Sequence, residues 1–276
     1  MSSGKQKQNS QAPIKGLLID IDGVLYTEKQ AIKGAVEAIR YLQKHRFPFL
    51  LATNTTRRSR FSLRNNLQRL GFKVTLEQIY SAPFAAAQWL KSHHVKSISL
   101  FVKGDTYREF KAFRNTTNHP EYLVIGDIGE DLTYDKLNQA FRLVVNGAKM
   151  LALQKNRCWQ RSSGLSIDTG AIVAALEYAT EKKATLIGKP SPAFFEHAVK
   201  QLNLPAENVA MIGDDWESDI VGSAKAGLQA IAVETGKFKH TPKRRTKYSA
   251  TVILPSIAEL PEYIESRLEV MQTNKS

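Results

Sequence analysis

Cysteine is almost absent from the sequence, and so are long apolar runs. Cys158 is the only cysteine, which excludes an internal disulfide and fits a reducing compartment such as the cytoplasm. It lies in Asn-Arg-Cys-Trp without a neighbouring histidine, so we expect it to pack or face solvent rather than act as a nucleophile. No apolar stretch approaches the roughly 20 residues of a membrane helix. Residues 1–13 lack the apolar segment of a secretory signal. We therefore expect a soluble cytoplasmic protein with a disordered tail at residues 1–13.

Acidic residues are outnumbered by basic ones. Lys and Arg number 39 against 26 Asp and Glu, which gives a formal net charge of +13. Such a charge permits binding to nucleic acid or attraction of anionic substrates. The densest basic segment, 237–247, has a single aromatic residue and no interleaved stacking platform, so we interpret it as a solvated loop. Nucleic-acid binding is kept as an alternative, which a flat titration with DNA and RNA at low salt would exclude.

Apolar and amphipathic segments alternate along the chain, which is typical of α/β proteins with parallel sheets. Residues 14–82 and 182–276 share one pattern, and residues 83–181 between them have an alternation of their own, which indicates an inserted α/β domain. The helices are expected at 31–45, up to Gly71, at 83–92, 104–113, 133–148 and 192–202, up to Ala226, and from 256 onward. The strands are expected at 17–19, 47–52, 97–102, 121–126, 150–153, 184–187, 208–212, 228–233 and 250–254.

Two aspartates follow the first apolar strand. Asp20 and Asp22 are two residues apart, so an extended backbone points them to the same side. Gly23 allows a sharp turn directly after them. The simplest interpretation is a strand followed by an Asp-Gly turn. The alternative is a nucleophile and an acid/base group beside a cation, because crowded carboxylates repel one another.

Three further strand ends carry polar groups. Ligands of parallel sheets bind beyond the carboxyl ends of the strands, so these groups can meet Asp20 although they lie far apart in sequence. Alone, each has an ordinary explanation as a turn, a surface lysine or a loop. Together they suit phosphoryl transfer. The groups are Thr53 and Asn54, Lys189, and Asp214 in Gly-Asp-Asp.

Each of these groups can supply one part of that reaction. Asp20 can attack phosphorus, and Asp22 can protonate the leaving alcohol and later deprotonate water. Lys189 can offset negative charge, and Asp214 can bind Mg²⁺ together with Asp20. A second acidic strand end, Asp127 followed by Asp131, precedes Lys189 and is interpreted as an ordinary strand and turn.

Four motifs, taken in their order along the sequence, resemble those of the haloacid dehalogenase superfamily. They are Asp20-Ile-Asp22-Gly23, Thr53-Asn54, Gly188-Lys189-Pro190 and Gly213-Asp214-Asp215. The resemblance covers nearly all of residues 14–265. It implies a Rossmann-like core at 14–82 and 182–276 with a C2-type cap at 83–181, as in the 4-nitrophenylphosphatase-like and NagD-like subfamily. Asp22 follows the general superfamily pattern, whereas close relatives are expected to carry Ser at this position. This difference weakens the inference that the chain acts on the same substrate as those relatives.

The resemblance also implies roles for individual residues. Asp20 is the nucleophile and a Mg²⁺ ligand, and Asp22 is the acid/base and offers its backbone carbonyl to the metal. The phosphate is held by Thr53, Asn54 and Lys189. Asp214 binds the metal, with Asp215 and Asp219 as outer helpers. In the cap, the polar stretch 154–157 is a candidate for substrate contacts, with a solvated loop as the alternative.

These inferences predict a Mg²⁺-dependent phosphatase of small phosphorylated substrates that works through an aspartyl-phosphate. The substrates are phosphate monoesters, with phosphoamino acids and pyrophosphate as further candidates. A phosphotransferase of the same fold is a second enzyme alternative, and a basic nucleic-acid-binding or regulatory protein is the non-enzyme alternative. We expect no membrane partner and leave a homodimer open.

Overall fold

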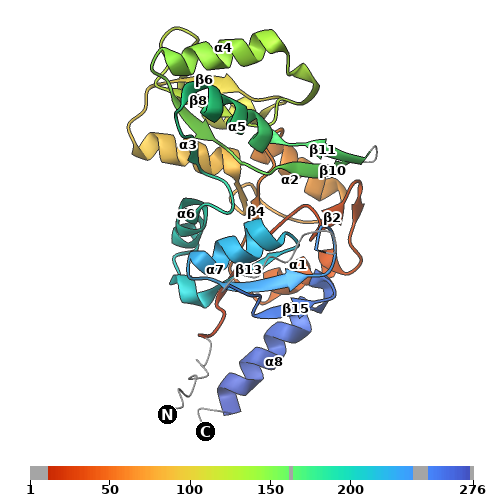
Figure 1. The fold of residues 1–276 in the computed structure, drawn as a ribbon. Coiled ribbons are helices and arrows are strands. Elements are labelled where there is room, and N and C mark those ends of the chain that lie inside the picture. Colours follow the sequence, from red (N-terminus) through yellow and green to blue (C-terminus); the bar gives the residue numbers. More distant parts are fainter. Residues whose placement is uncertain (1–11, 162–163, 239–247, 274–276) are drawn as a thin grey trace, which may run out of the picture.

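The computed structural model describes residues 12–161, 164–238 and 248–273. Its chain forms two parallel sheets, one above the other in Figure 1, with helices packed on their faces. The first sheet holds six strands in the order β15-β14-β13-β1-β4-β5. Their bounds are β15 Val252–Leu254, β14 Gln229–Val233, β13 Val209–Gly213, β1 Gly16–Ile19, β4 Phe49–Thr53 and β5 Ile79–Ser81.

The central strand β1 shows why the first sheet has helices on both faces. Leu17 and Ile19 belong to one buried apolar cluster, and Leu18 belongs to another. Successive side chains of a strand point to opposite faces, so a fully apolar strand must be covered on both. All four residues of β1 are buried.

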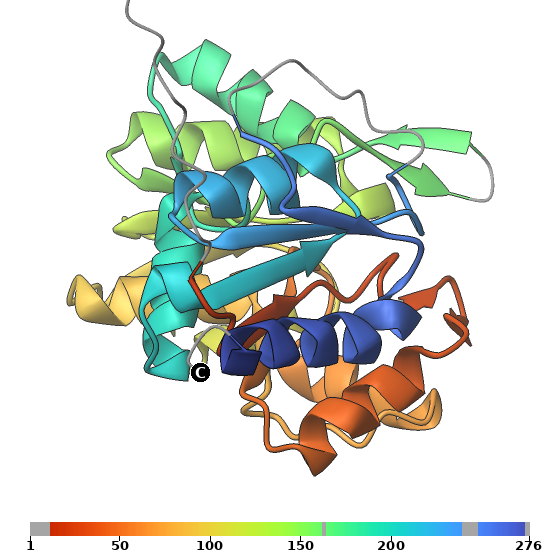
Figure 2. The ribbon, with the colours of Figure 1, turned by 90° about the horizontal axis from the view of Figure 1, so that it is seen from below.

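Two groups of helices provide this cover. On the face of Leu17 lie α1 (Ala35–Lys44), α2 (Arg60–Arg69) and α8 (Leu260–Thr273). On the face of Leu18 lie α3 (Ala82–Ser92) and α6 (Pro192–Leu202). A π-helical turn, η4 (Trp216–Val221), runs into the short α7 (Gly222–Lys225). Figure 2 shows α8 on one side of the first sheet and α7 on the other.

The second sheet has five parallel strands in the order β12-β9-β8-β6-β7. The strands are β12 Thr185–Leu186, β9 Lys149–Ala152, β8 Tyr122–Ile125, β6 Ser97–Phe101 and β7 Arg114–Asn115. One face packs against α4 (Tyr134–Val145) and α5 (Thr169–Thr180). The other face packs against α3, whose apolar cluster continues without a break into the first sheet.

The inserted region also carries an antiparallel hairpin and short 3₁₀ turns. The hairpin consists of β10 (Cys158–Arg161) and β11 (Gly164–Ile167), seen at the right of Figure 1. A second hairpin, β2 (Tyr26–Thr27) with β3 (Gln30–Ala31), follows the first acidic motif. The 3₁₀ turns of the inserted region are η1 Thr106–Phe110 and η2 Gly129–Asp131, and two further 3₁₀ turns, η3 Ala206–Asn208 and η5 Ile257–Glu259, lie outside it. Among the described residues, no helix combines the length and apolarity needed to cross a bilayer.

Two predicted elements differ in the structure. The pattern of residues 182–276 predicts that the strand at 184–187 joins the first sheet, but β12 pairs with β9 in the second sheet. The pairing extends to Gly188, whose N–H donates to Leu153 O at 3.0 Å. The sequence of a short apolar strand does not indicate which of two sheets it joins, so the pattern alone could not assign β12. The helix predicted at 104–113 is only the 3₁₀ turn η1, because its polar side chains bond to α2 instead of forming an apolar stripe.

The start of α2 is held by carboxylates from the inserted region. Asp105 accepts hydrogen bonds from Ser59 N at 2.9 Å, Ser59 Oγ at 2.5 Å and Ser62 Oγ at 2.7 Å. Glu109 accepts from Arg60 N at 2.7 Å. The free N–H groups and the dipole of a helix N-terminus favour such anions. The second sheet is therefore tied to the first on the side of α2 as well as through α3.

Replacing Asp105 with Ala should lower the free energy of unfolding by about 1–3 kcal/mol, because three donors at the start of α2 lose their acceptor. Urea unfolding measures this loss. The matched control is Asp135→Ala, an exposed carboxylate in the first turn of α4. It should cost less than about 1 kcal/mol. Equal losses in the two variants would contradict the docking role of Asp105.

Candidate active site

Three strands of the first sheet bring their polar residues to one edge. Asp20 directly follows β1, Thr53 ends β4, and Asp214 directly follows β13. β1 lies between the other two strands, and all three are parallel. The backbone N–H of Asp20 still donates to Ile212 O at 2.8 Å, so strand pairing continues up to the acidic residue. The three residues therefore meet at the carboxyl edge of the sheet.

Asp20, Asp214 and Asp219 form a buried acidic cluster. One carboxylate oxygen of each lies within 4.8 Å of the others. Burial raises the pKa of Asp20 and of Asp219. It also raises the pKa of Asp214 to about 7, and the charge of Asp219 adds to this effect. Hard oxygen donors that crowd and repel one another suit a small divalent cation such as Mg²⁺. The residues present thus fit the metal that the sequence predicts.

Lys189 lies inside this cluster. Its Nζ is 2.8 Å from Asp20 Oδ1 and 2.7 Å from Asp219 Oδ1, and it also donates to Ala52 O at 3.1 Å. The residue is 2% exposed, which is rare for a lysine and requires such partners. Burial lowers the pKa of Lys189, but Asp20 and Asp219 outweigh it, so the net shift is upward and the ammonium stays charged. One buried ammonium thus pairs with two of the three buried carboxylates.

Asn54 fixes the backbone of Lys189. Its Nδ2 donates to Lys189 O at 2.8 Å, and its Oδ1 accepts from Lys189 N at 2.9 Å. The amide group, predicted to contact phosphate, is therefore engaged on both sides with the chain that carries Lys189. This pairing brings the third motif next to the second although 135 residues separate them.

Asp214 is enclosed by two glycines and a backbone N–H. A Cβ on Gly23 would lie 2.1 Å from Asp214 Oδ2, and one on Gly236 would lie 2.0 Å from it. Both glycines have a positive φ, of +85° and +60°. Lys237 N donates to the same oxygen at 2.6 Å. The loop after β14 thus forms one wall of the site, and the sequence pattern did not reveal it.

Comparisons with known proteins agree with this geometry. Two family models match the chain, one described as haloacid dehalogenase-like hydrolase over residues 17–114 and one as HAD-hydrolase-like over residues 186–260. Phospholysine phosphohistidine inorganic pyrophosphate phosphatase of Homo sapiens is 35% identical over 254 residues, which cover 90% of this chain and 93% of that protein. The chain belongs to the haloacid dehalogenase superfamily.

Two further relatives support membership. Haloacid dehalogenase-like hydrolase domain-containing protein 2 of Bos taurus is 37% identical over 226 residues, which are 82% of this chain and 86% of that protein. The crystal structure of a double mutant of the thermostable NPPase of Geobacillus stearothermophilus superimposes with a TM-score of 0.80 at 28% identity, covering 89% of this chain and 97% of that one. The chain is therefore a haloacid dehalogenase-type phosphatase with a Rossmann-like core and a cap.

Within this haloacid dehalogenase fold, the residues predicted as outer helpers separate into two kinds. Asp219 is fully buried in the acidic cluster itself. Asp215 instead caps the π-helical turn, because its Oδ1 accepts from Glu217 N and Ser218 N, each at 3.1 Å. Its Oδ2 also lies 3.7 Å from Lys237 Nζ. Lys237 was placed in a solvated loop by the sequence, whereas the structure places it at the site, and residues 239–247 of that loop lie outside the described part.

Asp22 lies apart from the acidic cluster and is exposed. Its Oδ2 accepts a hydrogen bond from Thr55 Oγ1 at 2.9 Å. Thr53 is 1% exposed, and its hydroxyl donates to Thr55 Oγ1 at 3.0 Å. Thr55 follows the predicted pair Thr53 and Asn54 directly but was not predicted as a site residue. The signal available in the sequence was only its hydroxyl group two residues after Thr53.

Most side chains of the stretch predicted for substrate contacts, 154–157, bind other residues of the protein. Gln154 is buried and donates to Asp168 and Thr169, and Lys155 pairs with Glu177 at 2.9 Å. Arg157 extends toward the π-helical turn η4 beside the first sheet, and its Nη2 lies 3.9 Å from Glu217 Oε2. Asp127 and Asp131 pair with Arg57 and Lys103.

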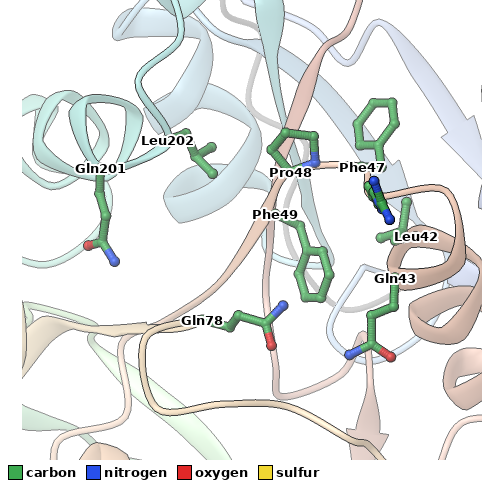
Figure 3. Close-up of a pocket in the computed structure, with 9 residues that line it drawn as sticks. Leu42, Gln43, Phe47, Pro48, Phe49, Gln78, Gln201 and Leu202 are labelled. Atoms are coloured by element: carbon green, nitrogen blue, oxygen red, sulfur yellow. The ribbon is translucent and has the colours of Figure 1, made fainter.

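A surface hollow of about 460 Å³ lies in a different part of the molecule (Figure 3). Its lining includes Pro48 and Phe49, at the amino end of β4, together with Gln78 and Leu202. The acidic cluster lies at the other end of the same strands. This hollow is therefore not part of the candidate active site.

Proposed function

We propose that the protein is a Mg²⁺-dependent phosphatase that hydrolyses small phosphorylated substrates through an aspartyl-phosphate on Asp20. The observation that carries the proposal is the buried group of three carboxylates, two of them paired with Lys189, at the carboxyl edge of a parallel sheet. A bound Mg²⁺ would be held by Asp20 and Asp214, with Asp219 beside them and the carbonyl of Asp22 as a further ligand. It would offset the repulsion between a carboxylate and a phosphate.

Two steps complete the reaction. In the first, a carboxylate oxygen of Asp20 bonds to phosphorus while the bond to the leaving oxygen breaks, and that oxygen keeps the electron pair and takes a proton from Asp22. In the second, water bonds to the same phosphorus and gives its proton to Asp22. The phosphorus–oxygen bond to Asp20 breaks and restores the carboxylate. Lys189 would balance the charge on Asp20 and on the transferring group, and Thr53 would orient it.

We further propose the domain division and the substrate class. Residues 83–181 would act as the C2-type cap on a core of residues 14–82 and 182–276, and the substrate would enter between them. One relative is named for activity on phospholysine, phosphohistidine and inorganic pyrophosphate. Phosphoramidates of amino acids and pyrophosphate therefore belong in a substrate panel beside phosphate monoesters.

The test is a phosphate-release assay with Mg²⁺ on this panel, followed by acid quenching during turnover. A phosphate label bound to the protein should be released by hydroxylamine, which cleaves acyl phosphates, and should map to the peptide that contains Asp20. With 4-nitrophenyl phosphate, whose leaving group needs little protonation, Asp22→Asn should accumulate more of this label, because its breakdown still needs a base for water. Failure to release phosphate from any substrate would overturn the function. Turnover without a labelled Asp20 would overturn the mechanism.

A further inference from the structure

Asp22 is held by side chains that neither the motifs nor the metal cluster include. An acid/base group must present its proton to one atom, yet Asp22 is exposed and its carboxyl lies outside the acidic cluster. An unrestrained carboxyl in solvent samples several rotamers. Some part of the protein must therefore restrict it if the proton is to be delivered efficiently.

Thr55 provides the first restraint, and Thr53 sets its direction. Thr55 N donates to Thr53 Oγ1 at 3.0 Å, and the Thr53 hydroxyl donates to Thr55 Oγ1 at 3.0 Å. The Thr55 hydroxyl then donates to Asp22 Oδ2 at 2.9 Å. In this series of hydrogen bonds, each threonine hydroxyl donates in the direction of Asp22. One carboxyl oxygen is thus fixed as an acceptor, and the other is left for the proton that is transferred.

Tyr26 in β2 provides the second restraint. The residue is 5% exposed, and its ring packs in the apolar cluster beneath the first sheet. The restraint lies in the backbone, because Gly23 N donates to Tyr26 O at 2.8 Å and Asp22 forms an isolated β-bridge with Tyr26. Asp22 is therefore bound to a loop after β4 and to the hairpin β2–β3.

We propose that Thr55 is a positioning residue that holds the Asp22 carboxyl in the orientation from which it protonates the leaving oxygen. This inference rests on the proposed function, in which the bond from phosphorus to that oxygen breaks as the proton arrives. It predicts that the Thr55 hydroxyl matters most for the substrates whose leaving groups depend most on protonation. A substrate with an acidic leaving group, such as 4-nitrophenyl phosphate, needs little help, whereas an alkyl phosphate needs full protonation.

The experiment compares kcat and KM of wild type, Thr55→Val and Thr55→Ser on a series of aryl and alkyl phosphates with Mg²⁺. For alkyl phosphates, Thr55→Val should lower kcat by about 10- to 100-fold, with KM nearly unchanged. For 4-nitrophenyl phosphate, the loss should stay below about 3-fold. Thr55→Ser keeps the donor and should stay within about 3-fold of wild type on every substrate.

Two reference variants make the result decisive. Asp22→Asn defines the largest selectivity that loss of the acid can produce. Thr117→Val, at an exposed threonine of the inserted region, controls for the same change of side chain away from the site. Equal losses on all leaving groups for Thr55→Val would assign Thr55 to phosphate binding or to structure and overturn the inference. No loss on alkyl phosphates would overturn it as well.

The outcomes separate this inference from the function on which it rests. If wild type releases no phosphate, or if Asp22→Asn shows no leaving-group selectivity, the proposed function or the role of Asp22 fails first. If wild type is active and Asp22→Asn is selective, but Thr55→Val is not, then only the positioning role is wrong.

Discussion

Replacing Asp20 with Asn should lower phosphate release by roughly 10⁴-fold or more, the scale seen when a covalent nucleophile is removed. The amide has the shape of the carboxylate but cannot form an acyl phosphate by attack on phosphorus. The measurement is steady-state release from 4-nitrophenyl phosphate with added Mg²⁺. Turnover at the wild-type rate would show that Asp20 is not the nucleophile.

The fold of this variant should survive, which makes the loss of activity interpretable. Burial and the charges of Asp219 and Asp214 raise the pKa of Asp20 although Lys189 opposes them, so the ionised carboxylate is unfavourable in the metal-free site. Lys189 keeps its ion pair with Asp219 at 2.7 Å when Asp20 becomes neutral. We expect the thermal unfolding temperature in EDTA to stay within a few degrees of wild type.

Two comparisons accompany this prediction. Asp135→Asn, an exposed position in α4, should leave activity and stability near those of wild type. Added Mg²⁺ should raise the unfolding temperature of wild type more than that of Asp20→Asn, because the ion relieves more repulsion when all three carboxylates are present. A variant that unfolds before the assay temperature would instead assign Asp20 a structural role.

The sequence was informative about this site because strand ends follow a simple rule. In a parallel sheet the carboxyl ends of the strands share one edge, so Asp20, Thr53 and Asp214 had to meet once their strands were assigned. Lys189 follows the second sheet's β12, not a strand of the first sheet. Its arrival at the same edge depends on the pairing of its backbone with Asn54, which no local pattern signals.

Asp219 illustrates a limit set by backbone geometry. Its distance of five residues from Asp214 does not match the three- or four-residue spacing of neighbours on an α-helix. The π-helical turn η4 returns its side chain beneath Gly213, where a Cβ would lie 2.2 Å from Asp219 Oδ2. The absence of a side chain at Gly213 therefore gives Asp219 its place. Such a close approach is visible only in three dimensions.

Replacing Lys189 with Met should affect stability and activity together. Removal of the ammonium leaves Asp20 and Asp219 buried without their shared cation, and breaking a buried ion pair on one side costs about 3–5 kcal/mol. Activity should fall by about 10²–10³-fold, the usual loss when one charge-stabilising donor is removed. Urea unfolding in EDTA and phosphate release with Mg²⁺ measure the two effects.

The pH dependence gives this prediction a definite sign. Lys189 lowers the pKa of Asp20 and of Asp219, so without it both folded-state pKa values rise further above those of the unfolded chain. A carboxyl whose pKa is raised by folding contributes stability at low pH and loses it as pH rises through the folded-state value. The deficit of Lys189→Met relative to wild type should therefore be larger at pH 8 than at pH 5, and Mg²⁺ should recover part of it at pH 8. Lys91→Met, at an exposed lysine of α3, should show neither effect. A deficit that does not change with pH would mean that Lys189 stabilises the protein by packing alone, and its charge would then have no part in holding the carboxylates together.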